Sequence, residues 1–196
     1  GVITEEFPYL EIAKEYEIAG ASAISCLTEP YYFQGKDLYL KEITQHVTIP
    51  VLRKDFTVDP YMIYQARTLG ASAILLICSL LSQSELEEYQ AMATELGMSA
   101  LVEAHDEREV EMALRAEASI IGVNNRNLKT FTVDINNSAR YRKMVPKEVA
   151  FVSESGIKTA EDIAKLLENG TDAVLIGETL MRSENKKQAL DELRGI

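Results

Sequence analysis

Tryptophan is absent from the 196 residues, and cysteine and histidine each occur only twice. The two thiols, Cys26 and Cys78, are isolated within apolar runs, so they cannot form the disulfide framework of a small secreted protein. We expect both to be reduced core residues of a cytoplasmic protein. His46 and His105 are too few for a histidine-rich site, and no metal is predicted.

Positive charge and long apolar runs are also scarce. Lys and Arg number 20 against 31 Asp and Glu, giving a formal net charge of -11 at pH 7. Nucleic acid is therefore not an expected partner, whereas a small anionic ligand needs only a local positive site. The longest nearly apolar run, residues 71–81, is too short to span a bilayer, and residues 1–6 lack the features of a signal peptide.

Apolar segments alternate regularly along the chain between strand-like and helix-like patterns. No linker interrupts them, so we expect one domain over residues 1–196. Expected helices cover residues 5–19, 37–47, 59–70, 82–97, 106–117, from 134, 159–170 and 186–193. Expected strands cover residues 21–27, 49–54, 73–77, 99–103, 119–124, 150–154 and 173–176. Strands that are apolar on both faces and alternate with helices predict a parallel sheet covered by helices.

An internal repeat indicates how that sheet is arranged. The motif GASAI at residues 20–24 recurs at 70–74, with a looser copy, GTDAV, at 170–174. Charged residues that end strands, Lys54, Glu103 and Glu154, are 49 and 51 residues apart. The period therefore contains two strand–helix units, and four such pairs make an eight-stranded TIM (β/α)8 barrel.

Only seven strands are found, and one period before Lys54 falls near residue 4. We therefore expect the first strand of the barrel to precede residue 1, which would leave the strands on either side of it as exposed edges. An open, doubly wound seven-stranded sheet is the less favoured alternative.

Polar residues cluster where the predicted strands end, the end at which barrel enzymes carry their active sites. Lys54 and Glu103 lie on alternate strands, so both are expected to point into one mouth. A lysine near an apolar core has its charged form disfavoured, which favours proton donation, and a glutamate can act as the complementary base. A plain salt bridge is the alternative. Other strand-end residues are Asp55, Asn124, Arg126, Glu154, Ser155 and Glu178.

The loops after the last two strands contain Ser155-Gly156 and Gly177-Glu178. Loops at these places in barrels often bind phosphate through backbone N–H groups and a short helix, here residues 179–182. The alternative is that both glycines only permit tight turns. The aromatic run at residues 31–33 is expected either to flank an apolar ligand ring or to plug the rim of the barrel.

These motifs together resemble the indole-3-glycerol phosphate synthase family, in the family's order over all 196 residues. The matching stretches are LTEPYYFQG (27–35), PVLRKDF (50–56), LVEAH (101–105), GVNNRNL (122–128), SESGI (153–157) and IGE (176–178). The resemblance implies a carbon–carbon lyase of tryptophan biosynthesis. It closes a ring on an anthranilate-bearing deoxyribulose phosphate, with loss of carbon dioxide and water, and uses no cofactor.

The resemblance also implies residue roles. Lys54 resembles the general acid, Glu103 the base or proton shuttle, and Asn124 a catalytic residue that positions substrate. The implied substrate-binding residues are Phe33, Phe56, Arg126, Glu154 and Ser155, and the phosphate-binding residues are Gly156, Gly177 and Glu178. The family's first strand, with its Glu-x-Lys and Ser-Pro-Ser, and its N-terminal helix have no counterpart in this sequence, so part of the site is expected to be missing.

Two other functions stay open: a different sugar-phosphate barrel enzyme, such as an isomerase, and an inactive barrel fragment that needs its first strand. A monomer is expected, and fusion of the parent protein to another enzyme of the tryptophan pathway stays open.

Overall fold

The computed structural model describes residues 7–126 and 132–196. Its strands are β1 (Ile24–Leu27), β2 (Val51–Lys54), β3 (Ala73–Ile77), β4 (Ser99–Ala104), β5 (Ile120–Asn124), β6 (Ala150–Glu154) and β7 (Ala173–Leu175). Its helices are α1 (Tyr9–Ile18), α2 (Asp37–His46), α3 (Pro60–Thr68), η1 (Cys78–Leu80), α4 (Gln83–Glu95), α5 (Glu107–Arg115), α6 (Asn136–Arg142), α7 (Ala160–Glu168), α8 (Glu178–Arg182) and α9 (Lys186–Arg194).

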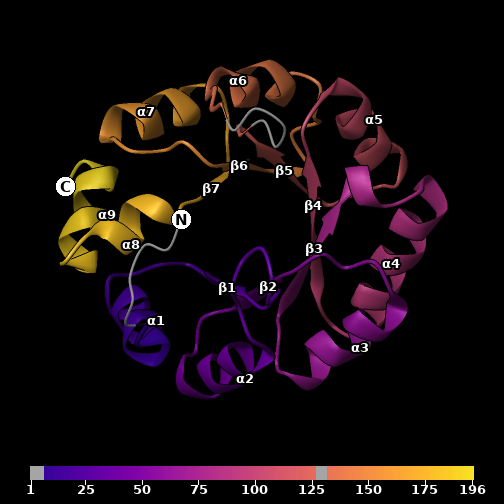
Figure 1. The fold of residues 1–196 in the computed structure, drawn as a ribbon. Coiled ribbons are helices and arrows are strands. Elements are labelled where there is room, and N and C mark those ends of the chain that lie inside the picture. Colours follow the sequence, from indigo (N-terminus) through magenta and orange to yellow (C-terminus); the bar gives the residue numbers. More distant parts are fainter. Residues whose placement is uncertain (1–6, 127–131) are drawn as a thin grey trace.

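The described strands form one parallel sheet in chain order, from β1 to β7. Figure 1 shows the sheet curling, with the helices arranged around its outer side. The curl brings α1 and α9 together, and the Arg194 guanidinium donates to the carbonyls of Ala19 and Gly20 at 3.3 and 2.6 Å. This confirms the predicted barrel-like fold. The doubly wound alternative is wrong, because the strand order never reverses.

Within the described sheet, β1 and β7 are the two edges. Both leave apolar side chains exposed: Leu27 is 40% exposed and Val174 is 36% exposed.

Element boundaries differ from the predictions by a few residues. The first strand begins at Ile24 rather than residue 21, and the short helix η1 was not expected. Asp134 does not directly cap α6, although its carboxylate accepts the N–H of Asn136 at 3.0 Å. The predicted capping boxes of α4 and α7 are present, with Ser82 and Thr159 as the capping residues. Residues 5 and 6 of the first expected helix lie outside the described residues.

Apolar side chains on both faces of the sheet explain why the strands read as continuous apolar runs. The outer face packs against the helices through residues such as Ile74, Val102, Ile121 and Phe151. The inner face carries a smaller buried cluster of Leu52, Leu75, Ile77 and Leu101. Because side chains alternate along a strand, residues two positions after this inner cluster lie on the same face, nearer the carboxyl ends of the strands.

The repeated glycines end helices and turn the chain into the next strand. Gly20, Gly70 and Gly170 have φ angles of +88°, +91° and +84°, a left-handed conformation that other residues adopt at a cost. The GASAI repeat therefore reflects a turn that recurs between helix and strand.

Gly70→Ala is expected to destabilise the protein by about 2 to 3 kcal/mol, because it combines left-handed strain with displacement of Thr44. A Cβ on Gly70 would lie 2.6 Å from the Thr44 Oγ1, which donates to the Leu69 carbonyl at 2.9 Å. Gly97→Ala is the control, since Gly97 has a φ of +73° but open space around it. It should cost about 1 kcal/mol. Equal losses in chemical denaturation would contradict this account.

Candidate active site

Lys54 lies between two carboxylates at the carboxyl end of the sheet. Its Nζ is 3.4 Å from the Glu103 Oε2 and 3.7 Å from the Glu154 Oε2. All three side chains are largely buried, with exposed fractions of 17% for Lys54, 3% for Glu103 and 2% for Glu154. The predicted convergence of β2 and β4 on one mouth is therefore confirmed.

The predicted electrostatic state of Lys54 is wrong. Burial works to lower the pKa of Lys54, but the charges of Glu154 and Glu103 outweigh it and raise that pKa above its ordinary value of 10.5. At the high pH where Lys54 would lose its proton, both Glu103 and Glu154 are ionised, and their charges compensate for lost water. Lys54 is thus a firmly held cation, suited to polarising an electron-rich oxygen.

The two glutamates titrate in opposite directions. Burial and the nearby charge of Glu103 raise the pKa of Glu154 to about 8. Burial also works to raise the pKa of Glu103, but the close contact with His105 and the charge of Lys54 lower it to about 2. At neutral pH the cluster therefore favours one ionised and one protonated carboxyl group, an arrangement typical of acid–base sites.

Gly122 makes room for the Glu154 carboxyl group. A Cβ at position 122 would lie only 2.1 Å from the Glu154 Oε1, so any larger residue would displace that group. Among the described residues, this buried oxygen has no hydrogen-bond partner. The sequence pattern did not reveal this role of Gly122, because it depends on contact between neighbouring strands β5 and β6.

Glu103 has further partners at its other oxygen. Its Oε1 accepts the Asn124 amide at 3.3 Å and lies 3.0 Å from the His105 Nε2. The Asn124 Oδ1 in turn accepts the N–H of Arg126 at 3.0 Å. Asn124 was predicted here and His105 was not, although it follows Glu103 by two residues, a spacing that places both on one side of an extended chain. The neighbouring predicted motif residues Asn127 and Leu128 lie outside the described residues.

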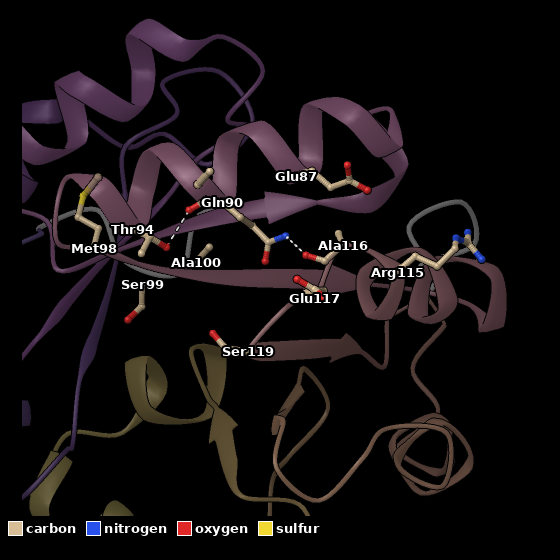
Figure 2. Close-up of a pocket in the computed structure, with 11 residues that line it drawn as sticks. Glu87, Gln90, Thr94, Met98, Ser99, Ala100, Arg115, Ala116, Glu117 and Ser119 are labelled. Carbon is tan, nitrogen blue, oxygen red and sulfur yellow. Dashed lines mark hydrogen bonds between the residues drawn. The ribbon is translucent and has the colours of Figure 1, made fainter.

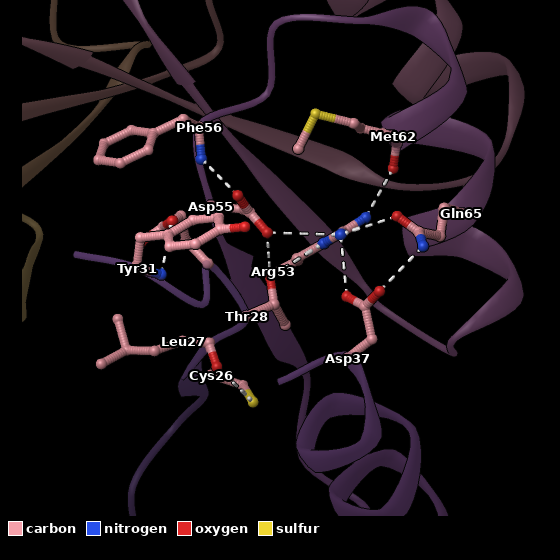
Figure 3. A network of polar contacts seen from close by, with 11 residues as sticks. Cys26, Leu27, Thr28, Tyr31, Asp37, Arg53, Asp55, Phe56, Met62 and Gln65 are labelled. Carbon is pink, nitrogen blue, oxygen red and sulfur yellow. Dashed lines mark hydrogen bonds and ion pairs between the residues drawn. The ribbon is translucent and has the colours of Figure 1, made fainter. Parts of the chain in front are cut away.

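Arg53 organises the loops on the outer side of the same strand (Figure 3). Its guanidinium is buried and donates to the Asp37 carboxylate, the Gln65 amide oxygen and the Met62 carbonyl, each at 2.9 Å. Its Nε donates to the Thr28 hydroxyl at 3.0 Å, and that hydroxyl donates to Asp55 at 2.5 Å. The network ties the loops after β1 and β2 to α2 and α3. Sequence reasoning missed it because its partners come from four segments.

Two aromatic rings from these loops meet at the mouth. The centroids of Phe33 and Phe56 are 4.9 Å apart. The backbone of the first loop is held by the buried Glu29 carboxylate, which accepts N–H bonds from Tyr31, Tyr32 and Phe33 at 2.8, 2.5 and 2.9 Å. Tyr31 and Tyr32 are 85% and 82% exposed, so this run is not a buried plug.

The two glycine loops lie side by side. The Thr179 hydroxyl donates to the Ile157 carbonyl at 2.8 Å and joins the loop after β6 to the start of α8. Gly156 has a φ of +82°, whereas Gly177 has an unstrained φ of -112° and open space around its Cα. The helix α8 begins at Glu178, one residue before the start of the predicted short helix. The exposed carboxylate of Glu178 pairs with Arg126 and Arg182 at 3.6 and 3.1 Å.

A separate cavity of about 790 Å³ lies at the opposite end of the strands, between α4 and α5 (Figure 2). It is bordered by Ser99 and Ser119, at the amino ends of β4 and β5, and by Gln90, whose amide donates to the Ala116 carbonyl at 2.9 Å. None of its lining residues belongs to the Lys54 cluster. Since parallel barrels carry their chemistry at the carboxyl ends of the strands, the mouth around Lys54 is the better candidate.

Two further properties bear on the class of site. Across residues 7–126 and 132–196, no three His, Cys, Asp or Glu side chains are grouped so that they could hold a metal ion. No helix in the same part of the chain is long and apolar enough to cross a membrane.

The fold and this mouth define a TIM-barrel-like α/β protein with an acid–base cluster at the carboxyl ends of its strands. The family model described as indole-3-glycerol phosphate synthase matches residues 1–193. The chain belongs to the indole-3-glycerol phosphate synthase family.

Similar proteins agree with this assignment. The indole-3-glycerol phosphate synthase of Ruminiclostridium cellulolyticum is 60% identical over 195 residues, which cover 100% of this chain and 75% of that protein. That of Lacticaseibacillus paracasei is 57% identical over 190 residues, 97% of this chain and 73% of that protein. Among solved structures, a thiamine phosphate pyrophosphorylase from Pyrococcus furiosus has a TM-score of 0.75 at 17% identity, covering 96% of this chain and 88% of that one. This last likeness shows the fold alone.

The opposite pKa shifts predict opposite effects of pH on stability. Glu154 has a folded pKa of about 8, above its ordinary value of 4.5, so its contribution to stability is complete below pH 4.5 and is lost as the pH rises to about 8. Relative to Glu154→Gln, the wild-type free energy of unfolding should therefore fall over that range, by up to about 1.4 kcal/mol per pH unit.

Glu103→Gln is the matched comparison. The folded pKa of Glu103, about 2, lies below 4.5, so its contribution is present above pH 4.5 and is lost as the pH falls toward 2. Urea titrations at a series of pH values measure both differences. Differences that do not vary with pH, or that vary with the same sign, would contradict the assigned charge states.

Proposed function

We propose that this chain catalyses the reaction of its family. In that reaction, 1-(2-carboxyphenylamino)-1-deoxyribulose 5-phosphate closes its ring, loses carbon dioxide and water, and becomes indole-3-glycerol phosphate. The activity is that of a carboxy-lyase in tryptophan biosynthesis. The observation that carries the proposal is the buried Lys54 cation held between Glu103 and Glu154, in a chain that matches the family model over residues 1–193.

Lys54 is the proposed general acid for ring closure. When the anthranilate ring carbon attacks the ribulose carbonyl carbon, negative charge develops on the carbonyl oxygen. The Lys54 ammonium is positioned to stabilise that oxygen and give it a proton. Its raised pKa keeps it protonated before the reaction, and the adjacent carboxyl groups supply a route by which it regains a proton.

Glu103 is the proposed base of the later dehydration. Loss of water requires a proton to leave one position of the intermediate and another to reach the departing hydroxyl. Glu103 is ionised and its Oε2 faces Lys54, so it can accept the first proton and pass it on. Asn124 fixes the other oxygen at 3.3 Å and thereby orients the carboxylate. Glu154 is proposed to lie beside the substrate in its protonated form.

Phe33 and Phe56 are the proposed walls for the aromatic ring of the substrate, since they meet at the mouth. Arg126 is proposed to position an anionic group of the substrate, because its guanidinium is 35% exposed at the mouth and pairs only loosely with Glu178, at 3.6 Å. An incoming carboxylate or phosphate can replace such an exposed partner at little cost.

The proposed phosphate site comprises Ser155, Gly156, Gly177 and Glu178. Gly177 gives the strongest support for this phosphate site. Its φ angle and the open space where a Cβ would lie would both allow a larger residue. A close approach by a ligand would explain the absence of a side chain. The competing interpretation, a tight turn, applies to Gly156, whose φ is +82°.

We further propose one domain over residues 1–196, acting as a cytoplasmic monomer without a metal or organic cofactor. The net charge of -11 supports a small anionic substrate at a local positive site, rather than nucleic acid, as the partner.

Release of carbon dioxide tests this function directly. Purified protein incubated with the anthranilate-bearing deoxyribulose phosphate should release one molecule of carbon dioxide for each molecule of indole product formed. The indole product is measured by its fluorescence. A sugar-phosphate isomerase would convert its substrate without releasing carbon dioxide, and an inactive fragment would release none. Either result would refute the proposal.

Lys54→Ala should lower kcat by about 10²- to 10⁴-fold, the usual contribution of a general acid. Lys187→Ala is the control: Lys187 is 62% exposed on α9 and pairs with Asp191 at 2.7 Å. It should leave turnover unchanged. Near-wild-type turnover of Lys54→Ala in the same fluorescence assay would remove Lys54 from the proposed role.

Gly177→Ala should raise KM by roughly tenfold with little change in Tm, because the added methyl group enters space proposed for phosphate. Gly156→Ala should instead lower Tm, because a Cβ there would lie 2.2 Å from the Val133 Cγ1. Steady-state kinetics and thermal denaturation separate the two effects. An unchanged KM in Gly177→Ala would argue against phosphate at this loop.

A further inference from the structure

His105 is held between two carboxylates directly after β4. Its Nε2 lies 3.0 Å from the Glu103 Oε1, and its Nδ1 lies 3.0 Å from the Glu109 Oε2. The backbone N–H of His105 donates to that same Glu109 oxygen at 2.8 Å. Among the described residues the His105 Nε2 has no hydrogen-bond partner, so its approach to Glu103 is an ion pair, which requires the imidazolium form of the ring.

The surroundings favour that charged form. Burial works to lower the pKa of His105, but its close contacts with Glu103 and Glu109 and the charges of these two groups outweigh burial and raise the pKa to about 9. Other ionisable groups also face this region. They are Glu154 from β6, Lys54 from β2, Asp106 at the start of α5 and the Cys78 thiol from η1, whose pKa burial raises to about 12. The neutral thiol adds no charge, so the two carboxylates in contact with the ring dominate.

We propose that His105 is a positioning residue, which, anchored by Glu109, holds the Glu103 carboxylate ionised and directs its Oε2 into the mouth. The proposal rests on the proposed function of Glu103 as a base. His105 and Asn124 together occupy Oε1, which leaves Oε2, 3.4 Å from Lys54, as the oxygen that can reach a substrate.

The arrangement suits a base that must release the proton it accepts. When Glu103 takes a proton from the substrate, its negative charge disappears, and His105 and Lys54 each lose one of the two acidic groups that face them. The protonated glutamic acid is therefore destabilised and passes the proton to the departing hydroxyl, which leaves as water. No other reactant is needed, because the proton removed from the intermediate is the proton returned.

His105→Gln is the informative variant, because the amide is polar like the imidazole ring but carries no charge. His46→Gln is the matched control on the exposed end of α2, where the His46 Nδ1 lies 2.7 Å from the Glu42 carbonyl oxygen. We expect His105→Gln to lower kcat by about tenfold, the equivalent of one pKa unit of lost charge interaction, with less than a twofold change in KM. In wild-type protein and in His46→Gln, kcat should fall above about pH 9 as His105 loses its proton, and this fall should be absent in His105→Gln.

A direct readout is independent of activity. The chain has two histidines, so NMR of the imidazole signals can be assigned by comparing wild-type protein with His46→Gln. The His105 signal should titrate near pH 9 and move to lower pH in Glu109→Gln. A neutral His105 at pH 7, or a kcat and pH profile for His105→Gln that match the control, would overturn the inference. If His105 titrates near pH 9 but the protein releases no carbon dioxide, the result would support the ion pair and refute the proposed function.

Discussion

The site depends on one constraint: charged groups sit directly above an apolar layer inside a curled parallel sheet. Side chains alternate along each strand, so Leu52 and Leu101 lie beneath Lys54 and Glu103 on the same face. The apolar layer removes water from below, and a charge without water requires a partner. The contacts of Lys54 with Glu103 and Glu154 follow from this requirement, as does the space provided by Gly122.

The same constraint separates the roles of the two carboxyl groups. Glu103 has a cation on either side and an amide donor, and it stays ionised. The Glu154 Oε1 has no hydrogen-bond donor among the described residues, and the group faces the charge of Glu103, so its neutral form is favoured. Neighbours, rather than residue type, thus decide which glutamate accepts a proton. The Arg53 network on the opposite face of β2 holds the adjoining loops, so the mouth is supported from the outside of the sheet as well.

Much of the fold was predictable because its signals are local. The capping boxes at Ser82 and Thr159 and the left-handed glycines of the GASAI repeat each depend on a few consecutive residues. The convergence of Lys54 and Glu103 was also predictable, since parallel alternate strands share one end. The favoured charge of Lys54, by contrast, was predicted wrongly, because the sequence shows that a lysine is near the core but not how many carboxylates meet it there.

The sequence by itself determined the alternation of strands and helices, the repeat of about 50 residues, the family and the set of polar residues at the strand ends. Tertiary structure alone decided the clamping of His105 between Glu103 and Glu109, the contact of Gly122 with Glu154, and the pairing of Arg53 with Asp37 and Gln65. The physical reason is distance. Propensity and alternation act over a few residues, whereas a buried charge is stabilised by whichever groups the curled sheet brings within about 4 Å.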